Sequence, residues 1–185
     1  WMLAMDSPRV SFLMPAYNAK AYIAEAIESV RRQTYPAWEL IVVDDGSDDG
    51  TGALSAEYAR RDDRISVLHE PHGGSSRARN AAARRARGEY LAVMDADDIA
   101  LPRRLEQSVP VLDRHPEWVA LGGNAVLFSG HSNREAVSAV CCDPHRIRRL
   151  LLTVCPLMHS SALIRTDAFR RVGGYRACFQ SAHDY

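Results

Sequence analysis

The chain has 185 residues, 46% of them hydrophobic, which suits one domain with a packed core. Its 23 basic and 23 acidic residues cancel, so no net charge steers it toward nucleic acid, and we expect no nucleic-acid partner. Lys20 is the only lysine, which excludes a P-loop lysine. No apolar run approaches the roughly 18 residues of a membrane span, and no signal peptide precedes the first strand.

The cysteines are Cys141, Cys142, Cys155 and Cys178. They lack the paired spacing of a zinc site, and adjacent cysteines rarely pair with each other. Reduced thiols in a cytoplasmic protein are therefore the better interpretation. The sequence does not specify the oligomeric state. Because the chain starts without an initiator and stops inside an expected element, we expect a C-terminally truncated piece of a longer protein.

Strands and helices alternate over the first 115 residues. Continuous apolar runs predict strands at 10–14, 40–43, 65–68 and 90–94. Helical spacing and start signals predict helices at 21–33, 51–60, 75–87 and 102–114. Such alternation is typical of right-handed crossovers and a parallel sheet.

The pattern changes beyond residue 115. Strands are expected at 118–128 and 136–140 without a helix between them, and a short strand at 161–164. Helices are expected at 145–152 and 166–171. This predicts a mixed half of the sheet.

Polar residues follow three of the four strands in the parallel part. Tyr17 and Asn18 follow the first, Asp44 and Asp45 the second, and Asp95 to Asp98 the fourth. Ligands of such sheets bind beyond the carboxyl ends of the strands, so these residues are expected to converge. Clustered carboxylates repel one another unless a proton or a cation intervenes, and oxygen ligands suit Mg²⁺ or Mn²⁺. Solvated turns are the alternative, and the convergence favours a site.

The helix at 75–87 begins after Gly73 and Gly74 and carries several arginines. Glycines at a helix start could admit a phosphate, which arginine could neutralise. Arg79 and Asn80 are the best candidates because they lie in the first turns. The later arginines are interpreted as a solvated face, and the histidines before the helix as loop residues.

Together these stretches resemble the family 2 glycosyltransferases of the GT-A fold. The matching segments are 10–18, 33–36, 39–47, 78–80, 88–90, 95–98 and 172–175. The resemblance covers nearly the whole chain and implies a Rossmann-like α/β/α sandwich with a mostly parallel sheet. It implies one catalytic domain over 1–185, with a nucleotide-binding half at 1–115 and an acceptor-side half at 116–185.

The resemblance further implies metal-dependent transfer of a sugar from a nucleotide-diphosphate donor to an acceptor hydroxyl, with inversion. The acceptor would be a carbohydrate or a lipid-linked molecule in bacterial polysaccharide or glycoconjugate synthesis. That role is compatible with a cytoplasmic protein at the inner face of the membrane. A diphosphate leaves readily only when a cation neutralises its developing charge, and an attacking hydroxyl needs a carboxylate to take its proton.

Residue roles follow from the same resemblance. Tyr17 would border the base, Asp45 would hydrogen-bond it, and Asp97 and Asp98 would hold the ribose and the Mg²⁺ or Mn²⁺. The general base would be Asp184, in a pair whose first residue is histidine instead of the usual glutamate. The full nucleotide-binding set is Pro15, Ala16, Tyr17, Asn18, Asp45, Arg79 and Asp97. Supporting residues are Asp44, Asp95 and His159.

Two alternatives remain open. The first is a nucleotide-sugar-binding module without catalysis, favoured by the missing glutamate and the missing C-terminal part. The second is a nucleotidyltransferase. Against it, this sequence lacks the glycine-rich triphosphate loop with a lysine that such an enzyme would be expected to have. A carboxylate at Asp45 can accept from the imide N–H of uracil or thymine, whereas it meets only acceptors on the corresponding edge of an unprotonated cytosine. We therefore expect a uridine or thymidine diphosphate donor.

Overall fold

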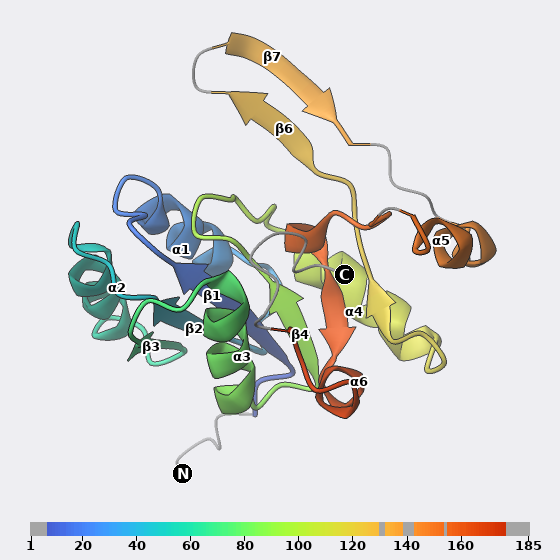
Figure 1. The fold of residues 1–185 in the computed structure, drawn as a ribbon, viewed down its shortest axis with the longest axis horizontal. Coiled ribbons are helices and arrows are strands. Elements are labelled where there is room, and N and C mark those ends of the chain that lie inside the picture. The colour runs from blue at the N-terminus through green and yellow to red at the C-terminus, as the bar shows by residue number, and fades with distance from the viewer. Residues whose placement is uncertain (1–6, 130–131, 139–142, 154, 177–185) are drawn as a thin grey trace.

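A six-stranded sheet forms the centre of the protein, with strand order β3-β2-β1-β4-β8-β5 (Figure 1). The computed structural model describes residues 7–129, 132–138, 143–153 and 155–176. The parallel strands are β1 (Val10–Ala16), β2 (Trp38–Asp44), β3 (Ile65–His69) and β4 (Tyr90–Val93). Strand β8 (Leu163–Arg165) runs antiparallel to β4 and to β5 (Ala120–Leu121). The predicted mostly parallel sheet with a mixed C-terminal part is confirmed.

Helices cover both faces of this sheet. On one face lie α1 (Ile23–Arg31), α2 (Thr51–Ala59) and α4 (Arg104–Arg114); on the other lie α3 (Ser75–Arg85) and α6 (Thr166–Arg171). Phe12 packs into the first layer and its neighbour Leu13 into the second, because successive strand residues face opposite ways. Burial on both faces explains the continuous apolar runs. No helix in the described ranges is long and apolar enough to cross a membrane.

The register aligns the carboxyl ends of the central strands. Ala16, the last residue of β1, lies beside Asp44, the last residue of β2. The main-chain N–H of Asp45 then donates to the Ala16 carbonyl at 2.9 Å. The chain leaves β4 at Val93, and Asp95 follows two residues later. The polar turns therefore meet at one edge of the sheet.

The segment 118–128 differs from its prediction as one strand. It contains β5 and the start of β6 (Val126–Ser129), which pairs with β7 (Ser132–Val137) in a separate hairpin. Between them, Ser161 Oγ lies 2.9 Å from both the N–H and the carbonyl of Gly123, so a side chain replaces a strand partner. A glycine weakens the interior of a strand, and an uninterrupted apolar run in the sequence does not reveal this effect. The strand expected at 136–140 starts earlier, and residues 139 and 140 lie outside the described residues.

The chain returns to the sheet through short elements. Helix α5 (Pro144–Leu150) is capped by Asp143, whose carboxylate accepts from the His145 N–H at 2.9 Å. A 3₁₀ turn, η1 (His159–Ser161), then precedes β8. Ser161, expected at the start of a strand, belongs to this turn, and the strand begins at Leu163.

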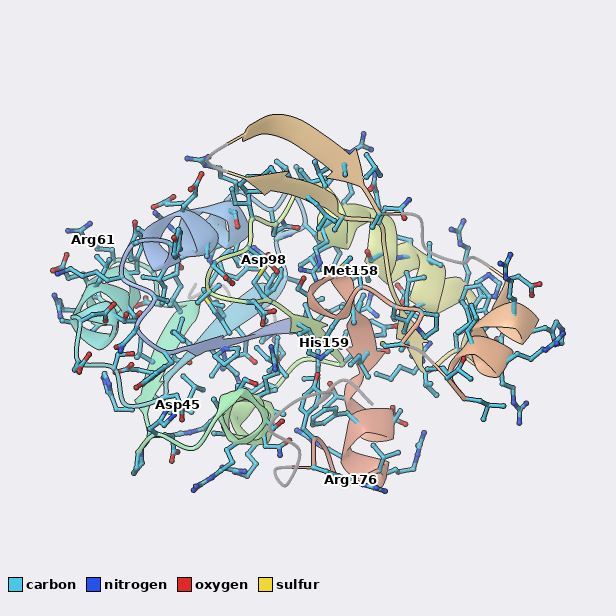
Figure 2. All side chains as sticks on the ribbon, turned by 45° about the horizontal axis from the view of Figure 1, so that its top comes forward. Asp45, Arg61, Asp98, Met158, His159 and Arg176 are labelled. Carbon is cyan, nitrogen blue, oxygen red and sulfur yellow. The ribbon has the colours of Figure 1, made fainter. Side chains whose placement is uncertain are left out.

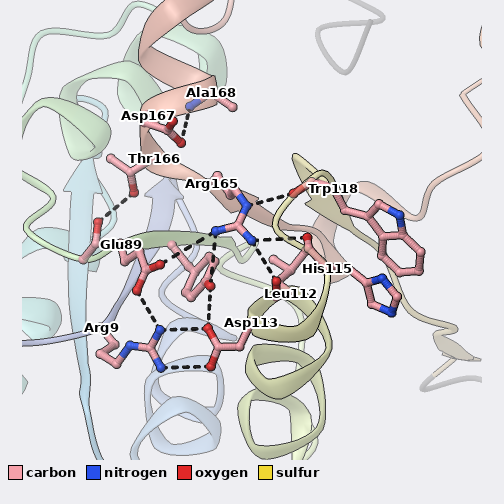
Figure 3. Close-up of polar contacts among 12 residues, drawn as sticks. Arg9, Glu89, Leu112, Asp113, His115, Trp118, Arg165, Thr166, Asp167 and Ala168 are labelled. Atoms are coloured by element: carbon pink, nitrogen blue, oxygen red, sulfur yellow. Dashed lines mark hydrogen bonds and ion pairs between the residues drawn. The ribbon is translucent and has the colours of Figure 1, made fainter.

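A polar network fixes the sheet at the edge opposite the polar turns (Figure 3). The Arg9 guanidinium donates to Glu89 at 2.6 Å and to Asp113 at 2.9 Å. Tyr90 donates to the same Asp113 carboxylate at 2.7 Å, and burial followed by this bond raises the pKa of Tyr90 to about 12. Arg165 donates to main-chain carbonyls at and beyond the end of α4. This network joins α4 to β1, β4 and β8, away from the cavity described next.

Candidate functional site

A cavity of about 380 Å³ lies at the carboxyl ends of the parallel strands. It is bordered by the loop after β1, the turn after β2, the start of α3 and the residues after β4. The lining residues are Pro15, Ala16, Tyr17, Asn18, Ala19, Tyr22, Asp45, Ser75, Arg79, Asp95, Ala96 and Asp97. Most of the residues that the sequence singled out therefore border one space.

Hydrogen bonds join the loop after β1 to the turn after β2 and fix one side of the cavity. Asn18 has a left-handed backbone, with φ of 48°, a conformation that asparagine tolerates better than most residues. Its N–H donates to Ser47 Oγ at 3.0 Å, and its side-chain oxygen accepts from the Asp48 N–H at 3.1 Å. The next residue, Ala19, donates its N–H to Thr51 Oγ1 at 2.8 Å. The loop that carries Tyr17 is thus attached to the start of α2.

An aromatic pair lies at the rim of the cavity. The rings of Tyr17 and His72 are stacked with centroids 4.1 Å apart and planes at 30°. Tyr17 remains 51% exposed. His72 Nδ1 lies 3.0 Å from Asp45 Oδ2. The sequence predicts His72 only as a loop residue. No spacing connects it to Tyr17, because the pairing depends on how the loop before α3 folds back.

The side chain of Asp45 stabilises the loop before α3. Its buried carboxylate accepts the N–H of Gly73 at 2.9 Å and that of Gly74 at 2.8 Å. Gly74 has φ of 87°, which favours glycine. A carboxylate has about four lone-pair sites, and these two amides with His72 use three. Asp45 therefore has a turn-stabilising role and keeps capacity for one further donor.

Arg79 and Asp95 both line the cavity and form an ion pair with each other. Arg79 comes from α3 and is only 3% exposed, whereas Asp95 follows β4. Within the described residues, Nε and Nη1 of Arg79 have no hydrogen-bond partner. Leaving buried guanidinium donors unpaired is costly, so a ligand oxygen that reached these two atoms would be stabilised by them. Oxygen atoms of a phosphate or of a base suit them best.

The two remaining acids of this stretch have different surroundings. Asp97 is exposed and lines the cavity, whereas Asp98 is half-buried and lies outside the lining. Figure 2 labels Asp98 near the middle of the molecule, with Met158 and His159 also labelled. Burial raises the pKa of Asp98, and a hydrogen bond with Ser160 opposes this shift.

The acids offer only oxygen donors, which fits Mg²⁺ or Mn²⁺ better than a softer metal. Asp97 and Asp98 are the available carboxylates, since Asp95 is paired with Arg79. In the described part of the chain, no group of three or more histidine, cysteine or acidic residues converges as a complete metal site. Ligands from a bound diphosphate and water would have to complete the shell.

Asp44 is outside the cavity lining. Its carboxylate lies 3.1 Å from His69 Nδ1 and accepts the N–H of Ser47 at 3.2 Å, so it stabilises the turn after β2. His159 contacts the hydroxyl of Tyr175 through Nε2 at 2.9 Å. Asp184 lies outside the described residues.

Asn80 has a structural contact that the sequence did not indicate. Its side chain donates to the Tyr175 carbonyl at 2.8 Å and accepts the Tyr175 N–H at 2.9 Å. A Cβ on Gly174 would lie 2.6 Å from the Asn80 side-chain oxygen, so the close approach requires glycine there. The side-chain amide of Asn80 therefore holds the segment after α6, and Asn80 is not among the residues that line the cavity.

Comparison with known proteins identifies one protein family over most of the chain. The model of the family described as glycosyl transferase family 2 matches residues 11–173. The putative glycosyltransferase EpsE of Bacillus subtilis is 33% identical over 175 residues, covering 93% of this chain and 62% of EpsE. TuaG of the same organism, a putative teichuronic acid biosynthesis glycosyltransferase, is 43% identical over 126 residues, covering 68% of this chain and 47% of TuaG. The chain thus spans less than two thirds of either relative.

A solved structure gives the same picture. The mannosyltransferase PcManGT from Pyrobaculum calidifontis, in complex with GDP-Man and Mn²⁺, superposes with a TM-score of 0.69. The two sequences are 26% identical, and the match covers 94% of this chain and 49% of PcManGT. The fold is therefore that of the GT-A glycosyltransferases, as the sequence predicted.

Proposed function

The chain belongs to glycosyl transferase family 2, and we propose that its cavity binds the nucleoside diphosphate of a sugar donor. One observation carries this proposal: Arg79 is buried at the cavity with Nε and Nη1 unpartnered among the described residues. A folded protein rarely keeps such donors without a use. A ligand that is anionic and rich in oxygen would satisfy both atoms.

In this proposal the base lies against Tyr17, whose exposed ring supplies an apolar face. Asp45 uses its remaining lone-pair capacity to accept an N–H from the base. Uracil and thymine carry such an imide N–H, which favours a uridine or thymidine donor. Asp95 acts as a positioning residue, because it holds Arg79 at the cavity.

We assign the divalent cation to Asp97 and Asp98. Mg²⁺ or Mn²⁺ bound there would neutralise the negative charge that develops on the departing diphosphate. The oxygen-only donor set supports this assignment, and so does the Mn²⁺ in the PcManGT complex. PcManGT is in complex with GDP-Man, so a related domain can take a donor with another base.

The reaction we propose is a single displacement. The oxygen of an acceptor hydroxyl forms a bond to the anomeric carbon as the bond from that carbon to the diphosphate oxygen breaks. Attack from the opposite side inverts the configuration. Asp184 would take the proton of the hydroxyl. The acceptor would be a carbohydrate or lipid-linked molecule of bacterial polysaccharide synthesis, which the similarity to TuaG supports.

The test is an assay of the full-length protein against a panel of nucleotide-sugars, with Mn²⁺ and with chelator. We expect release of nucleoside diphosphate from one donor, accelerated by an acceptor and suppressed by chelator. Binding without release or transfer under any acceptor condition would favour the inactive binding module. Pyrophosphate release from a nucleoside triphosphate would favour the nucleotidyltransferase.

A further inference from the structure

Helix α5 and the residues after it form a basic, apolar surface away from the cavity. We call residues 145–152 the α5 surface. Arg146, Arg148 and Arg149 are exposed in it, and none forms an ion pair within the described ranges. The helix lies at the periphery of the molecule and covers no part of the central sheet (Figure 1). The whole chain has zero net charge, so this positive cluster is a local feature.

Exposed leucines lie directly beside these arginines. Leu152 is 85% exposed and Leu151 is 46% exposed. A hollow of about 500 Å³ is bordered by Arg146, Arg149 and His145, together with Asp143 and Leu150. The carboxylate of Asp143 is used by the helix cap. Guanidinium groups at such a hollow suit a phosphate group, while the leucines suit acyl chains.

We propose that the α5 surface docks on an anionic phospholipid membrane. Arginines that can contact lipid phosphates, beside exposed leucines that can contact acyl chains, suit a segment at the membrane interface. A second copy of the same surface would bring like charges together in a two-fold contact. A nucleic acid would leave the leucines without partners. Docking through this surface does not depend on the donor or on the proposed catalytic residues.

The test measures binding of the full-length protein to vesicles of phosphatidylcholine with and without phosphatidylglycerol. We expect binding only when phosphatidylglycerol is present, and weaker binding at high salt. The variant R146Q/R149Q should weaken partitioning about 30-fold, which corresponds to about 2 kcal/mol for two arginines at an anionic surface. The variant L152S should weaken it about 10-fold through lost apolar contact.

The matched control is R84Q/R85Q, which removes two exposed arginines from α3. It should bind the vesicles as the unmodified protein does, because its charges lie on another surface. Absence of vesicle binding by the full-length protein, or equal loss in the control, overturns the proposal. It is also overturned if the α5 variants lower the melting temperature or dissociate a dimer, since α5 would then contact protein.

Discussion

The guanidinium of Arg79 on α3 is ion-paired with the carboxylate of Asp95, which follows β4. This pair connects α3 to the segment that follows β4, at the carboxyl ends of the parallel strands. It uses Nη2 and leaves Nε and Nη1 without partners in the described residues. Arg79 is therefore held in place by one acid, while Nε and Nη1 are buried beside the cavity without a partner in the described residues.

Replacing Arg79 by lysine should weaken binding of uridine diphosphate by about 10-fold or more, since an ammonium cannot offer several fixed donors at once. The fold should persist because lysine can still pair with Asp95. Calorimetric titration measures the affinity, with Arg84→Lys on the exposed side of α3 as the control. Unchanged affinity in Arg79→Lys would remove the central support for the donor site.

Replacing Asp98 by asparagine should weaken diphosphate binding about 10-fold or more in Mn²⁺, equivalent to about 1.4 kcal/mol. In chelator the variant and the unmodified protein should bind alike, because the lost interaction is with the metal. Glu57→Gln, an exposed acid on α2, serves as the control. If the unmodified protein binds equally well with metal and with chelator, the metal assignment to Asp97 and Asp98 is wrong.

Uridine or thymidine diphosphate should bind more tightly than cytidine diphosphate, because Asp45 accepts a ring imide N–H that unprotonated cytosine lacks. Asp45→Asn should lose this preference. It should also lower stability, since the bonds from Gly73 and Gly74 would no longer be charge-assisted. Competition titrations with uridine, thymidine, cytidine and guanosine diphosphate measure the preference. A clear preference for cytidine diphosphate would leave Asp45 with only its turn-stabilising role.

In the full-length protein, Asp184→Asn should lower turnover about 100-fold or more, the usual scale of positioned acid–base catalysis. Donor affinity should stay nearly unchanged, because the base acts on the acceptor. Steady-state kinetics combined with a donor titration separates the two effects. Full turnover on the true acceptor would place the base elsewhere in the chain.

Acid should reveal the contribution of Asp62 to stability. Arg64 donates to both of its carboxylate oxygens, at 2.9 and 2.8 Å, and these bonds hold the pKa of Asp62 at about 2, below 3.8. A depressed acid pKa stabilises the folded state above the unfolded value, and this contribution is lost as the pH falls from 3.8 toward 2. Asp62→Asn should cost about 2 kcal/mol near neutral pH.

Urea unfolding at several pH values measures this difference. It should shrink as the pH falls below about 4. Asp63→Asn, at the exposed neighbouring acid, should have little effect at any pH. A difference for Asp62→Asn that does not depend on pH would mean that the ion pair with Arg64 contributes nothing.

The central strands could be predicted because burial on both faces requires uninterrupted apolar residues, as in β2. The cavity could be anticipated because parallel strands bring their carboxyl ends to one edge, which places Tyr17, Asp45 and Asp97 around one space. The stacking of His72 on Tyr17 could not be predicted, since it depends on a loop that is folded by Gly74 and Asp45.

The second half was harder to predict for a related reason. Apolar continuity over 118–128 resembles one strand, but Ser161, distant in the sequence, bonds the backbone of Gly123 and divides it. Likewise, nothing local to Asn80 indicates that its side chain holds Tyr175. Tertiary contacts between distant residues decide both outcomes.

The most direct test of the donor site is a crystal structure of the protein with uridine diphosphate and Mn²⁺. We predict that the diphosphate lies within hydrogen-bonding reach of Arg79 Nε or Nη1, with the base against Tyr17 and the metal at Asp97 and Asp98. A well-ordered nucleotide bound elsewhere, with Arg79 contacting only Asp95, would contradict this account.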